Sequence, residues 1–146
     1  MLNALLVLAA FTANSPEAKV TAKNVPQLEA EVADISGYYT CKGVETGGKT
    51  YQRVVVIERK GDVYVVKWVI GSGSTFTGIG IRQSNTFAAS WALPGPNGQL
   101  ARGINVYRVE AVSGNARFSG RWANMPGNGV LQSETLTFLK ALDEEE

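Results

Sequence analysis

The stretch FAASWALPGPNG, residues 87–98, joins a strand-like run to a turn rich in proline, glycine and asparagine. The stretch FSGRWANMPGNG, residues 118–129, repeats this arrangement 31 residues later, with the phenylalanine, the tryptophan and the turn residues in the same order. A looser third copy is YVVKWVIGSGS, residues 64–74. A strand and turn unit that recurs in this way is typical of an antiparallel meander.

Eight strand-like runs follow one another along the chain, punctuated by glycine, proline, asparagine and serine. They are GYYTCKG (37–43), TYQRVVVIER (50–59), DVYVVKWVI (62–70), STFTGIGIRQ (74–83), TFAASWAL (86–93), RGINVYRVEAV (102–112), NARFSGRWA (115–123) and a last run over 132–142. Three of the links, at residues 60–61, 84–85 and 113–114, are short enough for hairpins. The pattern predicts an all-β fold, an eight-stranded antiparallel up-and-down barrel, with a two-sheet sandwich as the alternative.

The composition limits the classes of function. The 146 residues, 45% of them hydrophobic, suffice for one core and one domain. A formal net charge of +1 offers no electrostatic footprint for nucleic acid or an anionic membrane surface, so neither is expected as a partner. The chain has no histidine, the usual general base and the commonest metal ligand, so we expect no enzyme, metal site or cofactor. The one cysteine, Cys41, is expected to be a buried thiol.

The chain divides into four parts. Residues 1–13, MLNALLVLAAFTA, are too short to span a bilayer and resemble a secretory signal, which predicts an extracytoplasmic protein; the alternative is a short helix packed on the domain. Residues 14–35 are expected to form a linker and a short amphipathic helix from Pro26, which presents Leu28, Val32 and Ile35 on one face. Residues 36–142 form the barrel domain, and residues 143–146 are an acidic tail.

Aromatic residues alternate with other residues in three of the strands. Every tryptophan of the chain lies four residues after a tyrosine or phenylalanine. Side chains at positions i, i+2 and i+4 share one face of a strand. In the run FSGRW (118–122), the opposite face carries Arg117, Ser119 and Arg121. The charged face is expected to meet water, so the aromatic face points into the barrel.

These three strands are the third, fifth and seventh, which run in the same direction in a meander. Each tryptophan therefore ends its strand at the same mouth of the barrel. The sequence predicts a ring of Trp68, Trp91 and Trp122 at that mouth. A layer of Tyr64, Phe87 and Phe118 is expected about 13 Å deeper, at about 3.3 Å per residue.

An eight-stranded barrel is either just filled by side chains or holds one small ligand. Gly78, Gly80, Gly120 and Ala89 leave inward room, which favours a pocket. In the other interpretation, these small residues only offset the large ones in a tapered core. Both interpretations stay open at the level of the sequence.

Three charged residues share the parity of the inward-facing side chains: Arg53, Arg82 and Glu134. An inward charge needs a partner. We expect these residues to lie at solvated barrel ends, since charges are rarely buried. The alternatives are that Glu134 pairs with an arginine across the barrel, or that one of the three contacts a polar group of a ligand.

The strand count and the aromatic-x-x-x-Trp repeat over residues 37–142 resemble the calycin-type barrels, the lipocalins and avidins. This resemblance implies an exported barrel that holds a small ligand in one mouth. Lipocalins open with a Gly-x-Trp motif, whereas this chain has Gly37-Tyr38-Tyr39. The chain is also similar to small exported bacterial proteins labelled fibronectin-binding, through that Gly-x-Tyr opening, the Tyr-x-Val-x-Trp strand (64–68) and the Gly-Ile-Gly-Ile strand (78–81). That resemblance implies an adhesive function.

Two hypotheses of function follow from these patterns. The first is a non-enzymatic exported barrel that binds a small apolar or aromatic ligand at the tryptophan-lined mouth. Its candidate ligand-binding residues are Trp68, Trp91, Trp122, Tyr64, Phe87, Phe118, Tyr107, Arg82 and Glu134. The second is a protein-interaction module, an adhesin or an inhibitor of a secreted enzyme, that uses the loops 93–101 and 124–131 at the same mouth.

Overall fold

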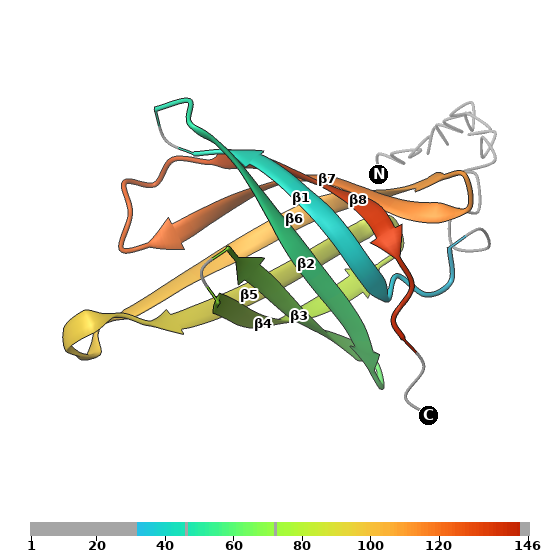
Figure 1. The fold of residues 1–146 in the computed structure, drawn as a ribbon, viewed down its shortest axis with the longest axis horizontal. Coiled ribbons are helices and arrows are strands. Elements are labelled where there is room, and N and C mark those ends of the chain that lie inside the picture. Colours follow the sequence, from blue (N-terminus) through green and yellow to red (C-terminus); the bar gives the residue numbers. More distant parts are fainter. Residues whose placement is uncertain (1–31, 46, 72, 144–146) are drawn as a thin grey trace, which may run out of the picture.

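The computed structural model describes residues 32–143, apart from residues 46 and 72. In this part of the chain, eight strands form one closed antiparallel barrel (Figure 1). The strands are β1 (Gly37–Val44), β2 (Thr50–Lys60), β3 (Val63–Ile70), β4 (Ser74–Gln83), β5 (Thr86–Pro94), β6 (Leu100–Val112), β7 (Asn115–Met125) and β8 (Gln132–Lys140). Each strand pairs with the next, and β8 pairs with β1, so the sheet has no free edge. The barrel prediction is confirmed, and the sandwich alternative is wrong.

The short links predicted from the sequence are tight turns. Ser84 and Ser113 adopt φ values of 54° and 52°, in the left-handed region that two-residue hairpin turns require. At the opposite end, the β5–β6 hairpin reaches beyond the other strands and carries the short 3₁₀ helix η1 (Pro96–Gly98) at its tip (Figure 1). This long hairpin lies at the mouth where β3, β5 and β7 end.

Residues 32–35, just before β1, close the other end of the barrel. The expected signal, the linker and most of the expected helix lie outside the described residues; residues 32–35, which end that helix, are not helical. Ile35 is fully buried, and its carbonyl accepts a hydrogen bond of 2.7 Å from the Tyr39 hydroxyl. The Val32 carbonyl accepts a hydrogen bond of 2.6 Å from Arg82 Nη1. In the part of the chain that the structure describes, no helix is long and apolar enough to span a membrane.

The half of the barrel away from the mouth where β3, β5 and β7 end is filled with aromatic rings. Phe87 and Phe118 are fully buried, with ring centroids 5.7 Å apart, and Tyr64 packs edge-on against Phe87 at 5.7 Å. Tyr107 packs against both phenylalanines at 6.3 Å and 5.8 Å, and Tyr39 packs against Phe118 at 5.1 Å. The predicted deep layer is confirmed, and it is a packed core rather than an open space.

The glycines on the inner face do not leave open room. A Cβ atom on Gly80 would lie 2.4 Å from Phe87 Cζ, and one on Gly120 would lie 2.5 Å from Tyr107 Cδ1. On Gly78, a Cβ would lie 2.0 Å from the Ser90 carbonyl oxygen. Aromatic rings and backbone from the neighbouring strands thus occupy the space over these glycines, a device that also helps a sheet to curve and close. Of the two interpretations that the sequence left open, these glycines fit the second, because they offset large neighbours.

Candidate functional site

The three tryptophans meet at one mouth, as predicted. They line a cavity of about 120 Å³ inside the barrel, above the packed aromatic layer. The residues that line this tryptophan cavity are Arg53, Trp68, Phe76, Trp91, Asn105, Trp122, Asn124 and Glu134. The barrel is therefore hollow at the tryptophan-lined end and filled in the half away from it.

The walls of the tryptophan cavity are mostly aromatic because the strand register places rings beside glycines. Trp91 lies opposite Gly78 on β4 and Gly103 on β6. A Cβ atom on Gly103 would lie only 2.3 Å from Trp91 Cζ2, so the indole lies against this glycine. Its other neighbour is Phe76, whose ring stacks on it at 4.8 Å with an interplanar angle of 12°. The result is a flat aromatic wall.

Glu134 forms the polar part of the cavity and is almost completely buried. One carboxyl oxygen accepts hydrogen bonds from the Tyr107 hydroxyl and from Asn105 Nδ2, the latter at 3.3 Å. The other accepts a hydrogen bond of 2.7 Å from the Tyr51 hydroxyl. A buried charged group is tolerated only when such partners replace water. The expected solvated position is therefore wrong for Glu134, and so is the alternative of a pairing with an arginine.

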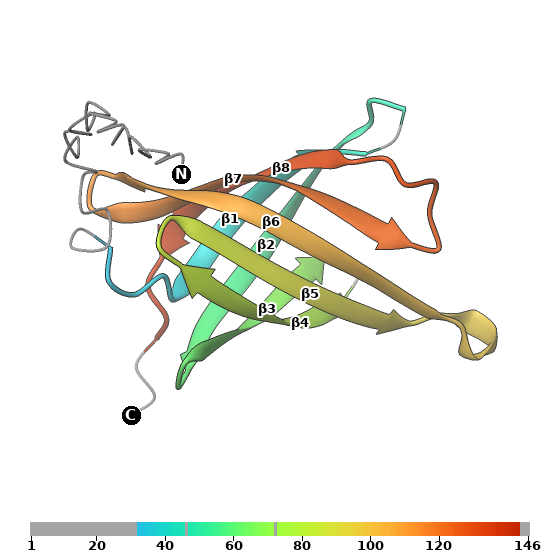
Figure 2. The ribbon, with the colours of Figure 1, turned by 180° about the vertical axis from the view of Figure 1, so that it is seen from behind.

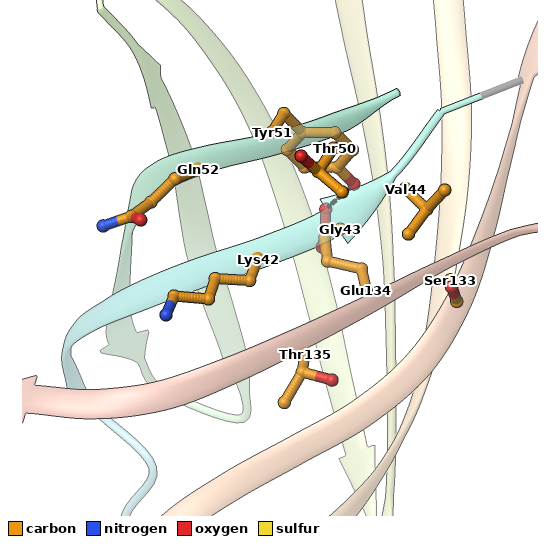
Figure 3. A pocket seen from close by; sticks show the side chains of 9 residues that line it. All are labelled: Lys42, Gly43, Val44, Thr50, Tyr51, Gln52, Ser133, Glu134 and Thr135. Atoms are coloured by element: carbon orange, nitrogen blue, oxygen red, sulfur yellow. Dashed lines mark hydrogen bonds between the residues drawn. The ribbon is translucent and has the colours of Figure 1, made fainter. Parts of the chain in front are cut away.

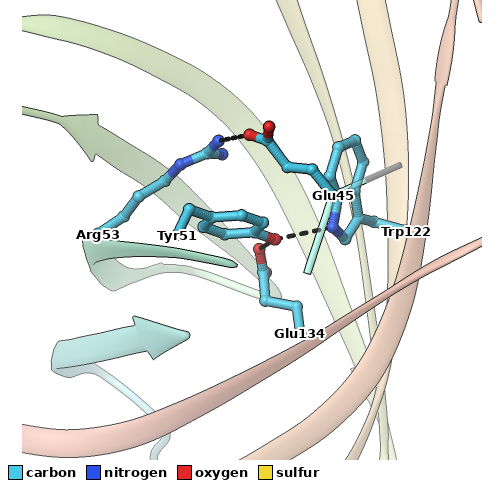
Figure 4. Close-up of polar contacts among 5 residues, drawn as sticks. All are labelled: Glu45, Tyr51, Arg53, Trp122 and Glu134. Atoms are coloured by element: carbon cyan, nitrogen blue, oxygen red, sulfur yellow. Dashed lines mark hydrogen bonds and ion pairs between the residues drawn. The ribbon is translucent and has the colours of Figure 1, made fainter. Parts of the chain in front are cut away.

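Two of the tryptophans are tied to this carboxylate through one residue each. Trp122 Nε1 donates to the Tyr51 hydroxyl at 2.8 Å, and Tyr51 donates to Glu134 (Figure 4). Trp91 Nε1 donates to Asn105 Oδ1 at 3.0 Å, and Asn105 donates to Glu134. Since each hydroxyl or amide receives on one side and donates on the other, the network orients both indoles.

Burial keeps the hydroxyl groups of this network protonated. It raises the pKa of Tyr107 well above its ordinary value, and the negative charge of Glu134 raises it further. Burial and the same carboxylate also raise the pKa of Tyr51, while the hydrogen bond from Trp122 lowers it. Both phenols therefore remain donors to Glu134 throughout the neutral range. Cys41 is fully buried, as predicted, and burial followed by the charge of Glu134 raises the pKa of its thiol.

Arg53 lies at the rim of the tryptophan cavity. Its guanidinium group stacks over the Tyr51 ring, 4.1 Å from the centroid, and lies 5.9 Å from the centroid of Phe76. Its Nη2 atom forms an ion pair of 3.4 Å with Glu45, just beyond the end of β1 (Figure 4). The positive charge is thus paired at the surface, and Arg53 closes part of the mouth.

A second hollow of about 630 Å³ lies over the ends of β1, β2 and β8, and Figure 3 shows its lining. Gly43 on β1 pairs with Tyr51 on one side and with Glu134 on the other. A Cβ atom at Gly43 would lie 2.2 Å from the Tyr51 hydroxyl oxygen. The missing side chain therefore lets Tyr51 cross β1 and reach Glu134 (Figure 3).

Trp68 differs from the other two tryptophans. It is 2% exposed, and its Nε1–H is buried without a hydrogen-bond partner among the described residues. The six-membered ring of the Trp68 indole points toward β4, since its Cζ3 atom lies 3.1 Å from the position that a Cβ atom on Gly78 would take. The Nε1 atom is on the other edge of the indole and faces away from that glycine. A buried donor without a partner is uncommon in a folded protein, because it loses its bond to water without replacement.

The remaining predicted site residues lie elsewhere. Tyr64, Phe87, Phe118 and Tyr107 belong to the packed core, and none of them lines the tryptophan cavity. Arg82 lies at the opposite end of the barrel, where it donates to the carbonyl groups of Val32 and Ser84. Arg82 thus lies at a barrel end, as expected, but at the end opposite the tryptophans, so the structure does not bring this candidate ligand-binding residue to the tryptophan cavity.

The candidate residues taken from the sequence left out Phe76, Asn105 and Asn124, which line the cavity, and Tyr51, which donates a hydrogen bond to Glu134 beside it. Parity was a signal for all four, since Phe76 shares its strand face with Gly78 and Asn124 shares its face with Trp122. Tyr51 shares its strand face with Arg53, and Asn105 shares its face with Tyr107, so both could have been placed inward by parity. Among the described residues, no three His, Cys, Asp or Glu side chains lie close enough together to hold a metal ion.

An apolar groove of about 770 Å³ lies on the outer surface of β4 to β7, on the face turned to the viewer in Figure 2. Ile79, Leu100, Ile104 and Met125 line it, and each is more than half exposed. Its floor is formed by Ser90 and Ala92, two small outward side chains of β5. Arg102 is the one charged residue among those that line this outer groove. Apolar side chains gathered in this way on a surface often mark an interaction site.

Comparison with known proteins supports the fold alone. The sequence matches no protein-family model and no curated protein sequence. The structure is similar to that of a redesigned β-barrel, with a TM-score of 0.52 and 16% sequence identity. The match covers 78% of this chain and 96% of the redesigned barrel. At this identity, the likeness carries no information about a ligand or a partner.

Proposed function

We propose that the protein is a non-enzymatic barrel that binds a small apolar or aromatic ligand in the tryptophan cavity. The observation that carries this proposal is the cavity itself, enclosed by three indoles and the Phe76 ring above a filled core. Ligand pockets in proteins are mostly apolar and aromatic, with a few polar groups that set the orientation of the ligand. Here Glu134 and the side chains bonded to it are those polar groups.

The volume limits the ligand to one ring. An engineered apolar cavity of about 150 Å³ binds benzene, and a water molecule accounts for about 30 Å³ of liquid. The tryptophan cavity, at about 120 Å³, is therefore close to the size of a single substituted ring. A larger ligand requires Arg53 to leave the rim, since its guanidinium group lies over Tyr51 and near Phe76.

Two further parts of the proposal rest on the sequence. Export from the cytoplasm rests on the signal-like residues 1–13. The absence of catalysis rests on the lack of histidine in the chain, since no other residue type serves so often as a general base. The resemblance to calycin-type barrels, which hold small ligands in one mouth, supports the same function.

The test is a titration of the protein with single-ring aromatic compounds, followed by tryptophan fluorescence and ligand-observed NMR. We expect a compound that enters the tryptophan cavity to quench the emission in a saturable way. Trp91→Ala removes a cavity wall, so the response should be lost or at least ten-fold weaker.

The control is Tyr38→Ala, since Tyr38 lies on β1 at the far end, beside Lys140, and is absent from the cavity lining. This variant should respond as the parent protein does. Circular dichroism verifies that both variants remain folded. The proposal fails when none of the compounds binds the parent protein up to its solubility limit.

The outer groove favours a second candidate function, a protein-interaction module. Leu100 at the start of β6 and Met125 at the end of β7 fall within the segments 93–101 and 124–131 that the sequence suggested for such contacts. Arg102 lines the groove and no acidic residue does, so the partner that fits it is a peptide segment with apolar side chains and a carboxylate. The resemblance to proteins labelled fibronectin-binding supports this candidate.

A further inference from the structure

We propose that the ligand of the tryptophan cavity is a single-ring aromatic cation, whose positive charge is balanced by the buried carboxylate of Glu134. This inference rests on the proposed function and names the charge of its ligand. It starts from the position of that carboxylate, which lines the cavity and forms no ion pair within the part of the chain that the structure describes.

The carboxylate of Glu134 lies near the axis of the barrel. Its side chain extends inward from β8, and its hydrogen bonds come from Tyr51 on β2 and from Asn105 and Tyr107 on β6. In a closed barrel of eight strands, β2 and β6 are on opposite sides, so a group that bonds to both lies between them. Asn105 lines the cavity and Tyr107 belongs to the core, which places the carboxylate at the boundary between the two. A ligand that enters from the tryptophan-lined mouth therefore meets it at the inner end of the cavity.

Among the described residues, only neutral groups bond to Glu134. Burial raises the pKa of Tyr51, Tyr107 and the Cys41 thiol, which all face this carboxylate, so each remains uncharged in the neutral range. The other charged residue of the cavity lining, Arg53, forms its ion pair at the surface instead. Neutral donors lower the cost of burying a carboxylate, but they leave its charge to be balanced by a cation in the cavity.

The walls of the cavity also favour a cation. Tryptophan attracts a cation to its ring face more strongly than the other aromatic side chains do, and three indoles surround this cavity. The rim already holds a cation in this way, because the Arg53 guanidinium lies 4.1 Å from the centroid of the Tyr51 ring and 5.9 Å from that of Phe76. An anionic ligand would be repelled by Glu134, where little water screens the charges.

The experiment compares N-methylpyridinium with toluene and phenol, which have the same ring shape and the same number of heavy atoms. NMR titration of the full chain gives the three affinities. In protein labelled with ¹⁵N at tryptophan, shifts of the indole N–H signals locate each ligand among the three indoles. We expect N-methylpyridinium to bind about ten-fold more tightly than either neutral compound, as a desolvated cation beside aromatic faces and a carboxylate should.

The matched variant is Glu134→Gln, which keeps the shape of the side chain and removes its charge. Its ratio of N-methylpyridinium to toluene affinity should fall about five-fold. The control is Glu110→Gln, which removes the same charge from the outer side of β6, where Glu110 pairs with Arg108. The affinity ratio of this control should equal that of the parent protein.

A second variant tests the same charge balance without a change at Glu134. Arg53→Met keeps a long apolar side chain and removes the positive charge that lines the cavity at the rim. Its ratio of N-methylpyridinium to toluene affinity should rise about three-fold. This comparison decides the question even where Glu134→Gln is unstable.

Each outcome bears on one claim. Toluene or phenol binding as tightly as N-methylpyridinium overturns the cation inference and leaves the proposed function standing. The same holds for a preference that Glu134→Gln retains, that Glu110→Gln loses equally, or that Arg53→Met leaves unchanged. When none of the three compounds binds, the proposed function itself fails at this cavity.

Discussion

The position of Glu134 shows how much one residue depends on its neighbours. The carboxylate is buried beside three tryptophans, an environment that by itself disfavours a charge. Hydrogen bonds from two hydroxyl groups and one amide make this position possible. The same bonds hold the donors in place, so Glu134 organises the mouth of the barrel.

Replacing Glu134 with glutamine should destabilise the protein. In Glu134→Gln, the new NH₂ group must face at least one side chain that donates to Glu134 in the parent protein. That buried donor then loses its acceptor. We expect the free energy of unfolding to fall by about 1–3 kcal/mol. Urea denaturation followed by tryptophan fluorescence measures the change.

The control for this variant is Glu110→Gln. Glu110 lies on the outer side of β6 in a partly exposed ion pair with Arg108, and such pairs contribute little to stability. The interpretation of Glu134 is contradicted when both glutamine variants unfold at the same urea concentration as the parent protein.

At the scale of the strand, glycines decide how closely neighbours approach. Gly78 on β4 lies opposite Trp91 on β5, and its missing side chain leaves space for the Ser90 carbonyl oxygen and the Trp68 ring. The close contact with a backbone atom is the important one, because a side chain can rotate away and a strand cannot. The identity of this residue therefore controls the pairing of β4 with β5.

A methyl group at this position should strain the sheet. We expect Gly78→Ala to lower the free energy of unfolding by about 1–3 kcal/mol or more, the usual range for overpacking. The control is Gly71→Ala in the β3–β4 link, where an added Cβ meets no atom within 4 Å. That change should alter stability by no more than about 0.5 kcal/mol. Thermal unfolding of both variants measures the change. An equal loss of stability in both variants would show that close packing at Gly78 does not cause the destabilisation.

At the scale of the whole molecule, closure of the sheet gives the barrel two distinct surfaces. The inner surface contains the core and the tryptophan cavity, and the outer surface contains the groove on β4 to β7. Trp91 and Asn124 line both the cavity and the groove. The two candidate sites are thus back to back across one layer of sheet, and their functions can be tested separately.

The outer groove should bind peptides that combine apolar side chains with carboxylates. Ile104→Ser puts a polar group in the middle of the groove, so we expect its affinity for such peptides to fall at least five-fold, as the loss of a buried aliphatic side chain implies. A peptide array that pairs acidic sequences with basic versions of equal apolar content, read by fluorescence anisotropy, measures this effect.

The control is Val54→Ser on β2, four strands away around the barrel and also on the outer surface. Its peptide affinity should equal that of the parent protein. Binding of acidic and basic peptides with equal affinity, or an equal loss in both variants, would exclude the groove as the specific site.

Much of the architecture could be predicted from local patterns. The alternation of inward and outward residues placed Trp68, Trp91 and Trp122 on the inner face, and the order of the strands placed them at one mouth. These predictions succeeded because side-chain direction in a strand depends only on parity, and strand direction in a meander depends only on order. The segment before β1 could not be predicted as well, since residues 32–35 close the barrel without forming a helix.

The details of the site depend on distances across the barrel, which a linear pattern does not contain. Parity gave the inward direction of Glu134, but the three donors around it come from β2 and β6. Parity also placed Arg82 inward, but its position at the far end separates it from the tryptophans. Whether an inward residue is solvated, paired or part of a cavity depends on what faces it from other strands.

Periodicity and turn chemistry were enough to predict the strands, their antiparallel order and the end at which the tryptophans lie, and they favoured a closed barrel over a two-sheet sandwich. The folded structure was needed to show that the half of the barrel away from the tryptophans is filled, that a cavity of about 120 Å³ remains beside them, and that Trp68 Nε1 has no hydrogen-bond partner among the described residues. The physical reason is that filling and hydrogen bonding depend on how rings and polar groups from different strands fit together, which register and closure fix only after the chain has folded.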